Sequence, residues 1–164
     1  MMKRLWIVLL AVLLLGCGAN ETAVFVDPNA VQAHGYGELY FEADGVRFGI
    51  FDEAEAVLNA LPAPRATFTG ETCAFDSRDE FYYFSGFELM TNEIDGTARV
   101  TAITLADDTV KTPQGLYIGM PMEDATAAFP ALSQNGWQLT DGTAQLSVVI
   151  TDGAVASIIY TPAE

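Results

Sequence analysis

The sequence predicts an α+β domain, and three observations predict it. A glycine-bounded alternating segment occurs twice, at 45–50 and 115–120, which is an offset of 70 residues. A short amphipathic stretch with helical spacing follows each copy. Alternating segments separated by Asp-Gly turns follow each helix, and such turns are typical of β-hairpins. We therefore expect two tandem repeats of strand, helix and antiparallel sheet, at 38–110 and 111–164, in one compact domain.

The N-terminal segment predicts export and lipid attachment. Lys3 and Arg4 precede the apolar run 5–15, which is shorter than the roughly 20 residues of a membrane-spanning helix. The run ends in Leu-Leu-Gly-Cys, which resembles a bacterial lipobox with Cys17 as the acylated residue. We expect 1–16 to be a cleaved signal peptide and Cys17 to carry a diacylglyceryl group and a fatty acyl chain such as palmitate. The alternative is an ordinary signal peptide that ends near a cysteine.

Small and polar residues fill the segment 17–37, which predicts a flexible tether after the lipidated cysteine. Twenty flexible residues have a root-mean-square reach of about 25 Å. We therefore expect the domain to stand clear of the lipid headgroups on the extracytoplasmic side of the cell membrane.

The chain is strongly acidic, with a formal net charge of −15. Loss of 1–16 removes two basic residues and leaves 5 − 22 = −17. Such a surface repels phosphate backbones and anionic headgroups, which excludes nucleic acid and a second membrane contact. A charged partner is expected to be cationic. The alternative is that acidity only keeps the protein soluble.

The two cysteines exclude an intrachain disulfide, because lipidation uses Cys17 and leaves Cys73 as a thiol. A nucleophile formed by Cys73 with His34, the single histidine, is one interpretation. The other is that Cys73 is a buried, inert core residue, since His34 lies in the predicted tether.

The first helix is predicted from residue 52 onward. Asp52 and Glu55 form a capping-box pattern, apolar residues then recur at helical spacing, and Pro62 ends the helix. Leu58 is expected to be buried against the sheet. The second helix is predicted to begin at Pro121 and to end at Pro130.

The remaining elements are strands. Asp95-Gly96, Asp141-Gly142 and Asp152-Gly153 mark turns between them. The predicted strands are 66–69, 73–75, 81–91 and 97–105 in the first repeat and 137–140, 146–150 and 154–160 in the second.

No motif in the chain points to catalysis. The sequence has no Gly-x-Ser-x-Gly elbow, phosphate loop, His-Glu-x-x-His or Cys-x-x-Cys. Two acidic clusters lack calcium-loop spacing and are expected to be solvated turns, although a carboxylate pair from them is one route to acid–base chemistry. We therefore predict no catalytic residue, no metal and no cofactor. The clusters are Asp76, Asp79 and Glu80, and Asp107 with Asp108.

An aromatic run at 81–84 is the main candidate for binding. If 81–91 is one strand, its odd positions continue into apolar Phe87 and form the core face. Its even positions, Tyr82 and Phe84, then lie on an exposed face, and Tyr40 lies between two glutamates at matching parity. We predict these three residues as a ligand-binding site for a protein or peptide. The alternatives are that other elements cover this face, or that a bulge at 85–86 swaps the two sets.

Several stretches resemble an uncharacterised family of clostridial lipoproteins over residues 38–160. That resemblance implies a Gram-positive host with a single membrane and implies no particular activity. The apolar-glycine-helix pattern is also similar to the tandem-repeat fold of β-lactamase inhibitory protein and to small outer-membrane assembly lipoproteins. The stretches are 40–42, 73–75, 87–89 and 107–119.

Three functions are compatible with the sequence. The first, which we favour, is a non-catalytic module that binds a protein or peptide at the membrane surface. The second is an envelope assembly or scaffold role. The third is a hydrolase or a metal-dependent enzyme.

Overall fold

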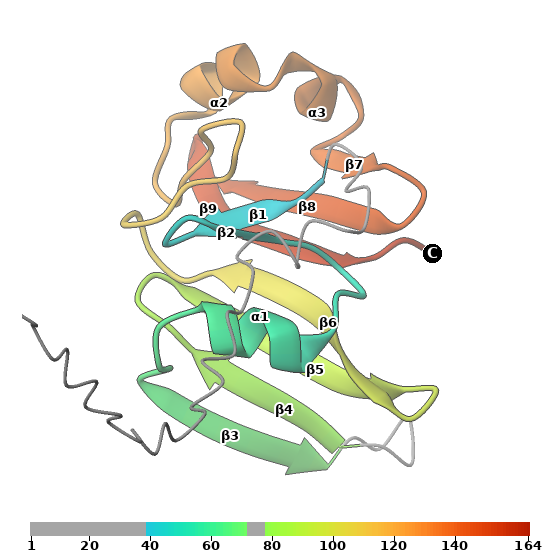
Figure 1. Cartoon of the computed structure of the whole chain (residues 1–164). Helices are drawn as coiled ribbons and strands as arrows, with labels where there is room; N and C mark the ends of the chain where they lie inside the picture. Colours follow the sequence, from blue (N-terminus) through green and yellow to red (C-terminus); the bar gives the residue numbers. More distant parts are fainter. Residues whose placement is uncertain (1–38, 72–77) are drawn as a thin grey trace, which may run out of the picture.

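The computed structural model describes residues 39–71 and 78–164, and its main element is a large antiparallel sheet (Figure 1). The strand order in this sheet is β3-β4-β5-β6-β9-β8-β7. Its strands are β3 (Ala66–Glu71), β4 (Arg78–Tyr83), β5 (Phe87–Ile94), β6 (Thr97–Leu105), β7 (Gln138–Thr140), β8 (Ala144–Thr151) and β9 (Ala154–Pro162). A separate hairpin and three helices accompany it: β1 (Phe41–Ala43), β2 (Val46–Phe48), α1 (Ala54–Ala60), α2 (Met122–Ala128) and α3 (Pro130–Gln134).

The predicted α+β class is confirmed, with antiparallel strands predominating and few helices. Several predictions fall on residues outside the described ranges. These are the signal peptide, Cys17, the tether with His34, and the strand 73–75 with Cys73.

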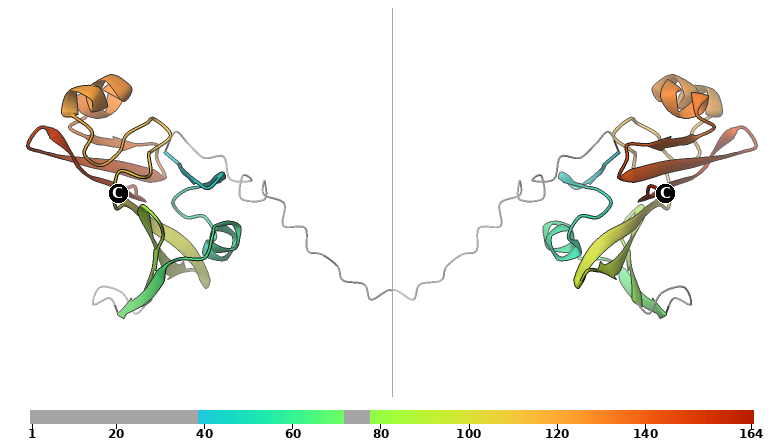
Figure 2. Two further views of the ribbon diagram at one scale, coloured as in Figure 1. Left: turned by 90° about the vertical axis from the view of Figure 1, so that its left-hand side faces the viewer. Right: turned by 90° about the vertical axis from the view of Figure 1, so that its right-hand side faces the viewer.

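The hairpin β1–β2 and helix α1 lie on the same face of the large sheet (Figure 2). Phe41 of β1 contacts Phe87 of β5 at a ring-centroid distance of 5.2 Å and Tyr160 of β9 at 6.2 Å. Phe41, Phe87 and Tyr160 are all buried. One hydrophobic core therefore includes side chains from both the β3–β6 and the β7–β9 parts of the sheet.

These two parts of the sheet meet at a short junction between β6 and β9. Only two residue pairs form the ladder there, Ile103 with Tyr160 and Thr104 with Ile159. Near the N-terminal ends of β6 and β9, these strands do not pair with each other. The segment before α1 pairs with β6 there, and the segment before α2 pairs with β9. We call 51–53, before α1, and 119–121, before α2, the lead-in segments.

Each lead-in segment makes the same pair of backbone hydrogen bonds. Val100 of β6 exchanges two bonds with segment 51–53, at 2.8 and 2.9 Å. Val155 of β9 exchanges two bonds with segment 119–121, at 2.7 and 2.8 Å. The lead-in segments therefore occupy the edges of β6 and β9 that the short junction leaves open.

The first helix starts later than the capping-box pattern predicts. Glu53 is the N-cap residue and makes no side-chain cap bond. Asp52 is buried, and its Oδ2 accepts a hydrogen bond of 2.8 Å from the Gly49 N–H. Asp52 therefore stabilises the turn before the helix. Leu58 is only half-buried, and Val57 is the residue of α1 with no exposed surface.

The segment 111–164, predicted as a second repeat, differs from its prediction in two places. Residues 116–118 do not form a strand, although Leu116 is fully buried. Pro130 follows α2, as predicted, but it also begins α3, because proline suits the first position of a helix.

Candidate binding surface

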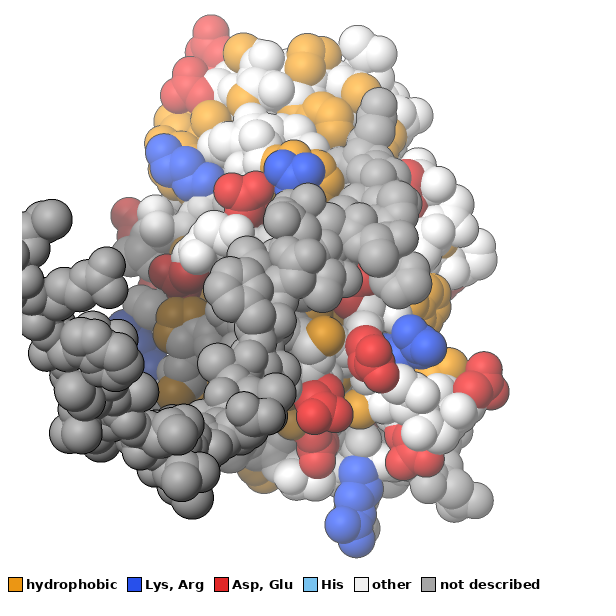
Figure 3. All heavy atoms as spheres, viewed as in Figure 1, with side chains coloured by type: hydrophobic (Ala, Val, Ile, Leu, Met, Phe, Trp, Pro, Cys, Tyr) orange, Lys and Arg blue, Asp and Glu red, His pale blue; other side chains and the backbone are white. Residues whose placement is uncertain are grey.

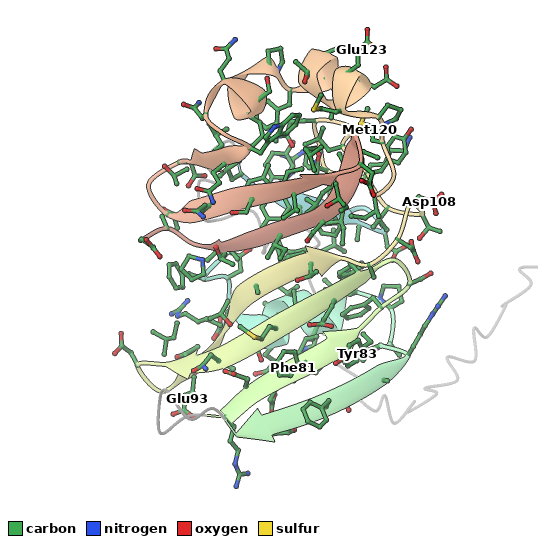
Figure 4. The ribbon with its side chains drawn as sticks, turned by 180° about the vertical axis from the view of Figure 1, so that it is seen from behind. Phe81, Tyr83, Glu93, Asp108, Met120 and Glu123 are labelled. Carbon is green, nitrogen blue, oxygen red and sulfur yellow. The ribbon has the colours of Figure 1, made fainter. Side chains whose placement is uncertain are left out.

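Three aromatic side chains lie together on the face of the sheet opposite α1, which we call the uncovered face. Phe81 and Tyr83 project from β4 on this face (Figure 4), and Phe68 of β3 is paired with Phe81. The Phe68 and Phe81 rings are 6.0 Å apart between centroids. Phe68 is 58% exposed and Tyr83 is 38% exposed. We call Phe68, Phe81 and Tyr83 the aromatic patch.

Gly70 of β3 lies beside two of these rings. A Cβ atom at Gly70 would lie 3.4 Å from Cε1 of Phe68 and 3.6 Å from Cε2 of Phe81, which are ordinary contact distances. The Phe68 and Phe81 rings therefore both lie near the strand at this glycine.

The prediction that 81–91 is one strand with Tyr82 and Phe84 on its exposed face is wrong, because 81–91 belongs to two strands, β4 and β5. The chain reverses at Ser85-Gly86, where the Phe84 N–H donates to the Phe87 carbonyl at 2.9 Å and Gly86 has a φ of +87°. A two-residue turn places Phe84 opposite Phe87, so even positions of β4 share a face with odd positions of β5. The exposed and core residues of 81–84 are therefore exchanged relative to the prediction, and the cause is a turn at 85–86 rather than a bulge.

Phe84 is consequently a core residue, and the prediction that it is exposed is wrong. Its exposed fraction is 8%, and it stacks on Phe87 with 4.7 Å between centroids and 9° between ring planes. Tyr82 shares the core face and is half-buried. Its hydroxyl donates to Oε2 of Glu80 at 2.6 Å. Burial raises the pKa of Tyr82 to about 12, with a further contribution from Glu80.

Tyr40 lies elsewhere, just before β1 and against the side chain of Arg47. The Arg47 guanidinium carbon is 4.2 Å from the centroid of the Tyr40 ring, which is a cation–π contact. The structure therefore does not bring Tyr40, Tyr82 and Phe84 together on one exposed face. The turn at 85–86 decides which residues of the aromatic run at 81–84 lie on the uncovered face.

Polar and apolar residues of β5 border the aromatic patch. Met90 is paired with Phe81, and Glu88 is paired with Tyr83. Asp79 is almost buried, and its Oδ1 accepts a hydrogen bond from the Asn92 side chain. The patch is thus an apolar area with the Glu88 carboxylate at its border, while the Asp79 carboxylate is buried and bonded to Asn92. The exposed Arg65 and Arg78 stand just before β3 and at the start of β4.

A hollow of about 490 Å³ lies at the ends of β4, β5 and β6. Glu80, Glu93 and Asp95 line it together with Arg78. Acidic side chains are also frequent on the α1 face, around α1 and over α2 (Figure 3). Cationic groups are therefore attracted to several parts of the described surface.

Asp107, in one of the two acidic clusters, binds a neighbouring residue of its own loop. The Asp107 Oδ1 accepts hydrogen bonds from the backbone N–H and the hydroxyl of Thr109, and these bonds lower the pKa of Asp107. Within 39–71 and 78–164, no three histidine, cysteine, aspartate or glutamate residues are grouped so that they could hold a metal ion.

Comparisons with protein-family models, with curated proteins and with solved structures found no match for this chain. In the part of the chain that the structure describes, none of the helices has the length and apolar character needed to span a membrane.

Proposed function

We propose that this protein is a lipid-anchored lipoprotein on the extracytoplasmic side of the cell membrane, and that its domain binds another protein or peptide without catalysis. The proposed binding site is the aromatic patch, in place of the site predicted from sequence. Aromatic side chains contribute strongly to protein interfaces because they bury a large area at a small entropic cost. Three of them at the surface of one sheet are therefore suited to this role.

We further propose that the two halves of the domain are copies of one unit, as in the tandem-repeat inhibitory proteins. The lead-in segments 51–53 and 119–121 support this, because both make the same two bonds to a valine. Helices α1 and α2 support it too, since each has seven residues and directly follows its lead-in segment. Phe48 and Leu116, each fully buried, then correspond. This correspondence has an offset of 68, so the glycine pattern in the sequence is misaligned by two residues.

The β3–β6 and β7–β9 parts of the sheet differ on the uncovered face, and this difference supports the binding proposal. One row of paired residues crosses the uncovered face and is centred on the β6–β9 junction, which places Tyr83 and Gln138 at matching positions in it. The polar Gln138 occupies the position that matches Tyr83. The sheet itself therefore does not require an aromatic side chain at this position. The row is Ala66, Tyr83, Glu88, Thr104, Ile159, Ser147 and Gln138.

The charge of the chain limits the class of partner. A net charge of −15 favours association with cationic proteins and disfavours nucleic acid, whose phosphates it repels. We therefore propose a partner that presents apolar side chains together with lysine or arginine.

The test of binding uses the full chain in a neutral detergent as bait for an envelope extract. Serine at Phe68, Phe81 and Tyr83 should reduce the captured partner at least about tenfold, because the apolar contact area is lost. The matched control has serine at Gln138 and Val149, on the uncovered face of the other half, and should capture the partner normally. Equal capture by both variants, with unchanged melting of each, would place the site elsewhere.

The test of the anchor is metabolic labelling with a fatty acid. The wild-type protein should incorporate the label, and Cys17→Ser should neither incorporate it nor sediment with membranes. A Cys17→Ser protein that still fractionates with membranes would contradict lipid attachment at this residue.

A further inference from the structure

The aromatic patch adjoins an open edge of the sheet. Strand β3 is the outermost strand on this side, and within the described residues no strand pairs with it on the side away from β4. It has six residues, whereas β7 at the other end of the sheet has three. The sheet therefore has one long edge, and this edge belongs to the half that carries the patch.

The sequence of β3 lacks the features that usually block strand addition. Edge strands are commonly protected by lysine, proline or a bulge. Residues 66–70 are Ala-Thr-Phe-Thr-Gly, with neither charge nor proline, and the charged residues Arg65 and Glu71 stand only at the two ends of this stretch. The pairing of β3 with β4 is regular. Thr67, Phe68 and Thr69 are exposed. Within 39–71 and 78–164, no strand pairs with the backbone N–H and C=O groups on the outer side of β3, which form an open edge for another extended chain.

We infer that the partner binds as an added strand along β3, with alternate apolar side chains beside Phe68 and with lysine or arginine among the others. This inference rests on the proposed function, since the added strand extends the surface of the aromatic patch. In strand addition, backbone bonds supply affinity and alternate side chains supply specificity. A second copy of this chain is a poor occupant, because two molecules with a net charge of −15 repel each other.

The test uses synthetic decapeptides and the full chain in a neutral detergent, with affinity measured by calorimetry. The parent peptide alternates lysine and valine, and a control peptide alternates glutamate and valine. Two further peptides carry N-methyl groups, either on every lysine or on every valine. Because alternate N–H groups of a strand point to opposite edges, each methylated peptide loses the donors of one edge only.

We expect the lysine peptide to bind at least about tenfold more tightly than the glutamate peptide, because of the charge of the protein. We also expect the affinities of the two N-methylated peptides to differ at least about tenfold, because one of them cannot donate to β3. Phe68→Ser should weaken binding of the parent peptide, and the control Val149→Ser should not.

Three results would overturn strand addition. The first is equal binding of both N-methylated peptides; if Phe68→Ser still weakened binding, the aromatic patch would remain the site and only the added strand would be wrong. The second is no binding of any peptide. The third is a dimer in analytical ultracentrifugation that Thr67→Lys dissociates, which would make a second copy the occupant of the edge.

Discussion

The β3–β6 and β7–β9 parts of the sheet are alike where they are buried and different where they are exposed. Leu89 of β5 and Val148 of β8 are both buried, and each pairs with a fully buried isoleucine of the neighbouring strand. On the uncovered face, Tyr83 of one part and Gln138 of the other are each the third residue from the β6–β9 junction in one row of paired residues. Packing requires apolar side chains only on the inner face. Residues at exposed positions can differ between the two parts without loss of packing. The aromatic patch lies at such positions, and we propose it as the binding site.

The two parts also differ at their outer edges. The β3–β6 part ends in a six-residue strand with exposed threonines, whereas the β7–β9 part ends in a three-residue strand. Short edge strands resist pairing with other chains. Among the described residues, one end of the same sheet therefore carries a short edge strand and the other a longer one, which is the edge where we propose strand addition.

The largest expected effect tests whether the two parts share one core. Leu89→Ala should lower the free energy of unfolding by roughly 2–5 kcal/mol, because it leaves a cavity at a fully buried site. Val148→Ala should cost less, because valine is smaller. Both variants should unfold in a single transition by calorimetry. A separate transition for either part would show that each part folds around a core of its own.

The next prediction compares two turn glycines with positive φ. Gly86 has a φ of +87° and Gly142 has a φ of +93°. Alanine in this region costs roughly 1–2 kcal/mol at either site. At Gly86 the new Cβ would also lie 2.5 Å from Oγ1 of Thr109 and 2.7 Å from Cγ1 of Val110, whereas no atom lies within 4 Å at Gly142. Gly86→Ala should therefore be the more destabilising in urea titrations, and equal costs would mean that the 109–110 loop yields freely.

A smaller effect is expected for Phe68→Ser. The ring is 58% exposed, so its loss should change the free energy of unfolding by less than about 1 kcal/mol. Thermal melts of this variant and of Val149→Ser, an exposed valine in the other part, provide the matched pair. A cost above about 2 kcal/mol for Phe68→Ser would show that the aromatic patch is structural.

The smallest expected effect is a change in the free energy of unfolding at alkaline pH, caused by Tyr82. The pKa of Tyr82 is raised from 10.0 to about 12, so the unfolded chain loses this proton at a lower pH than the folded protein. The stability contribution is complete below pH 10 and is lost as the pH rises through about 12. Tyr82→Phe should therefore lose less stability between pH 10 and 12 in denaturant titrations, while Tyr160, whose pKa burial also raises, is present in both proteins. Identical pH profiles would contradict the raised pKa.

Local signals in the sequence predict much of this fold. The strand 97–105 and the Asp-Gly turns at 95–96 and 152–153 are found as predicted, because an aspartate and a glycine with positive φ define a tight hairpin by themselves. Contacts between distant segments are not predicted. The bonds of the lead-in segments to Val100 and Val155 join residues far apart in sequence and have no local pattern.

The candidate site also could not be fully predicted from local sequence patterns. The aromatic run at 81–84 indicates a surface of interest, but its exposed set depends on whether 85–86 continues a strand or reverses it. Ser-Gly is a weaker hairpin signal than Asp-Gly, and the glycine is needed here both for its φ and for the close approach of Val110. One turn therefore moves the proposed site from Tyr82 and Phe84 to Phe81 and Tyr83.

The short β6–β9 junction has a consequence for the order of folding. Strands β3–β6 precede β9 in the chain and pair with sequence neighbours, so they can assemble before β9 joins them. Without β9, the inner edge of β6 would be a template for aggregation. The segment 51–53 is already present at that stage and covers this edge near Val100, which leaves chiefly Ile103 and Thr104 open. The segment 51–53 thus protects part of this edge against mispairing before β9 is in place, and it keeps the same bonds to Val100 in the folded domain.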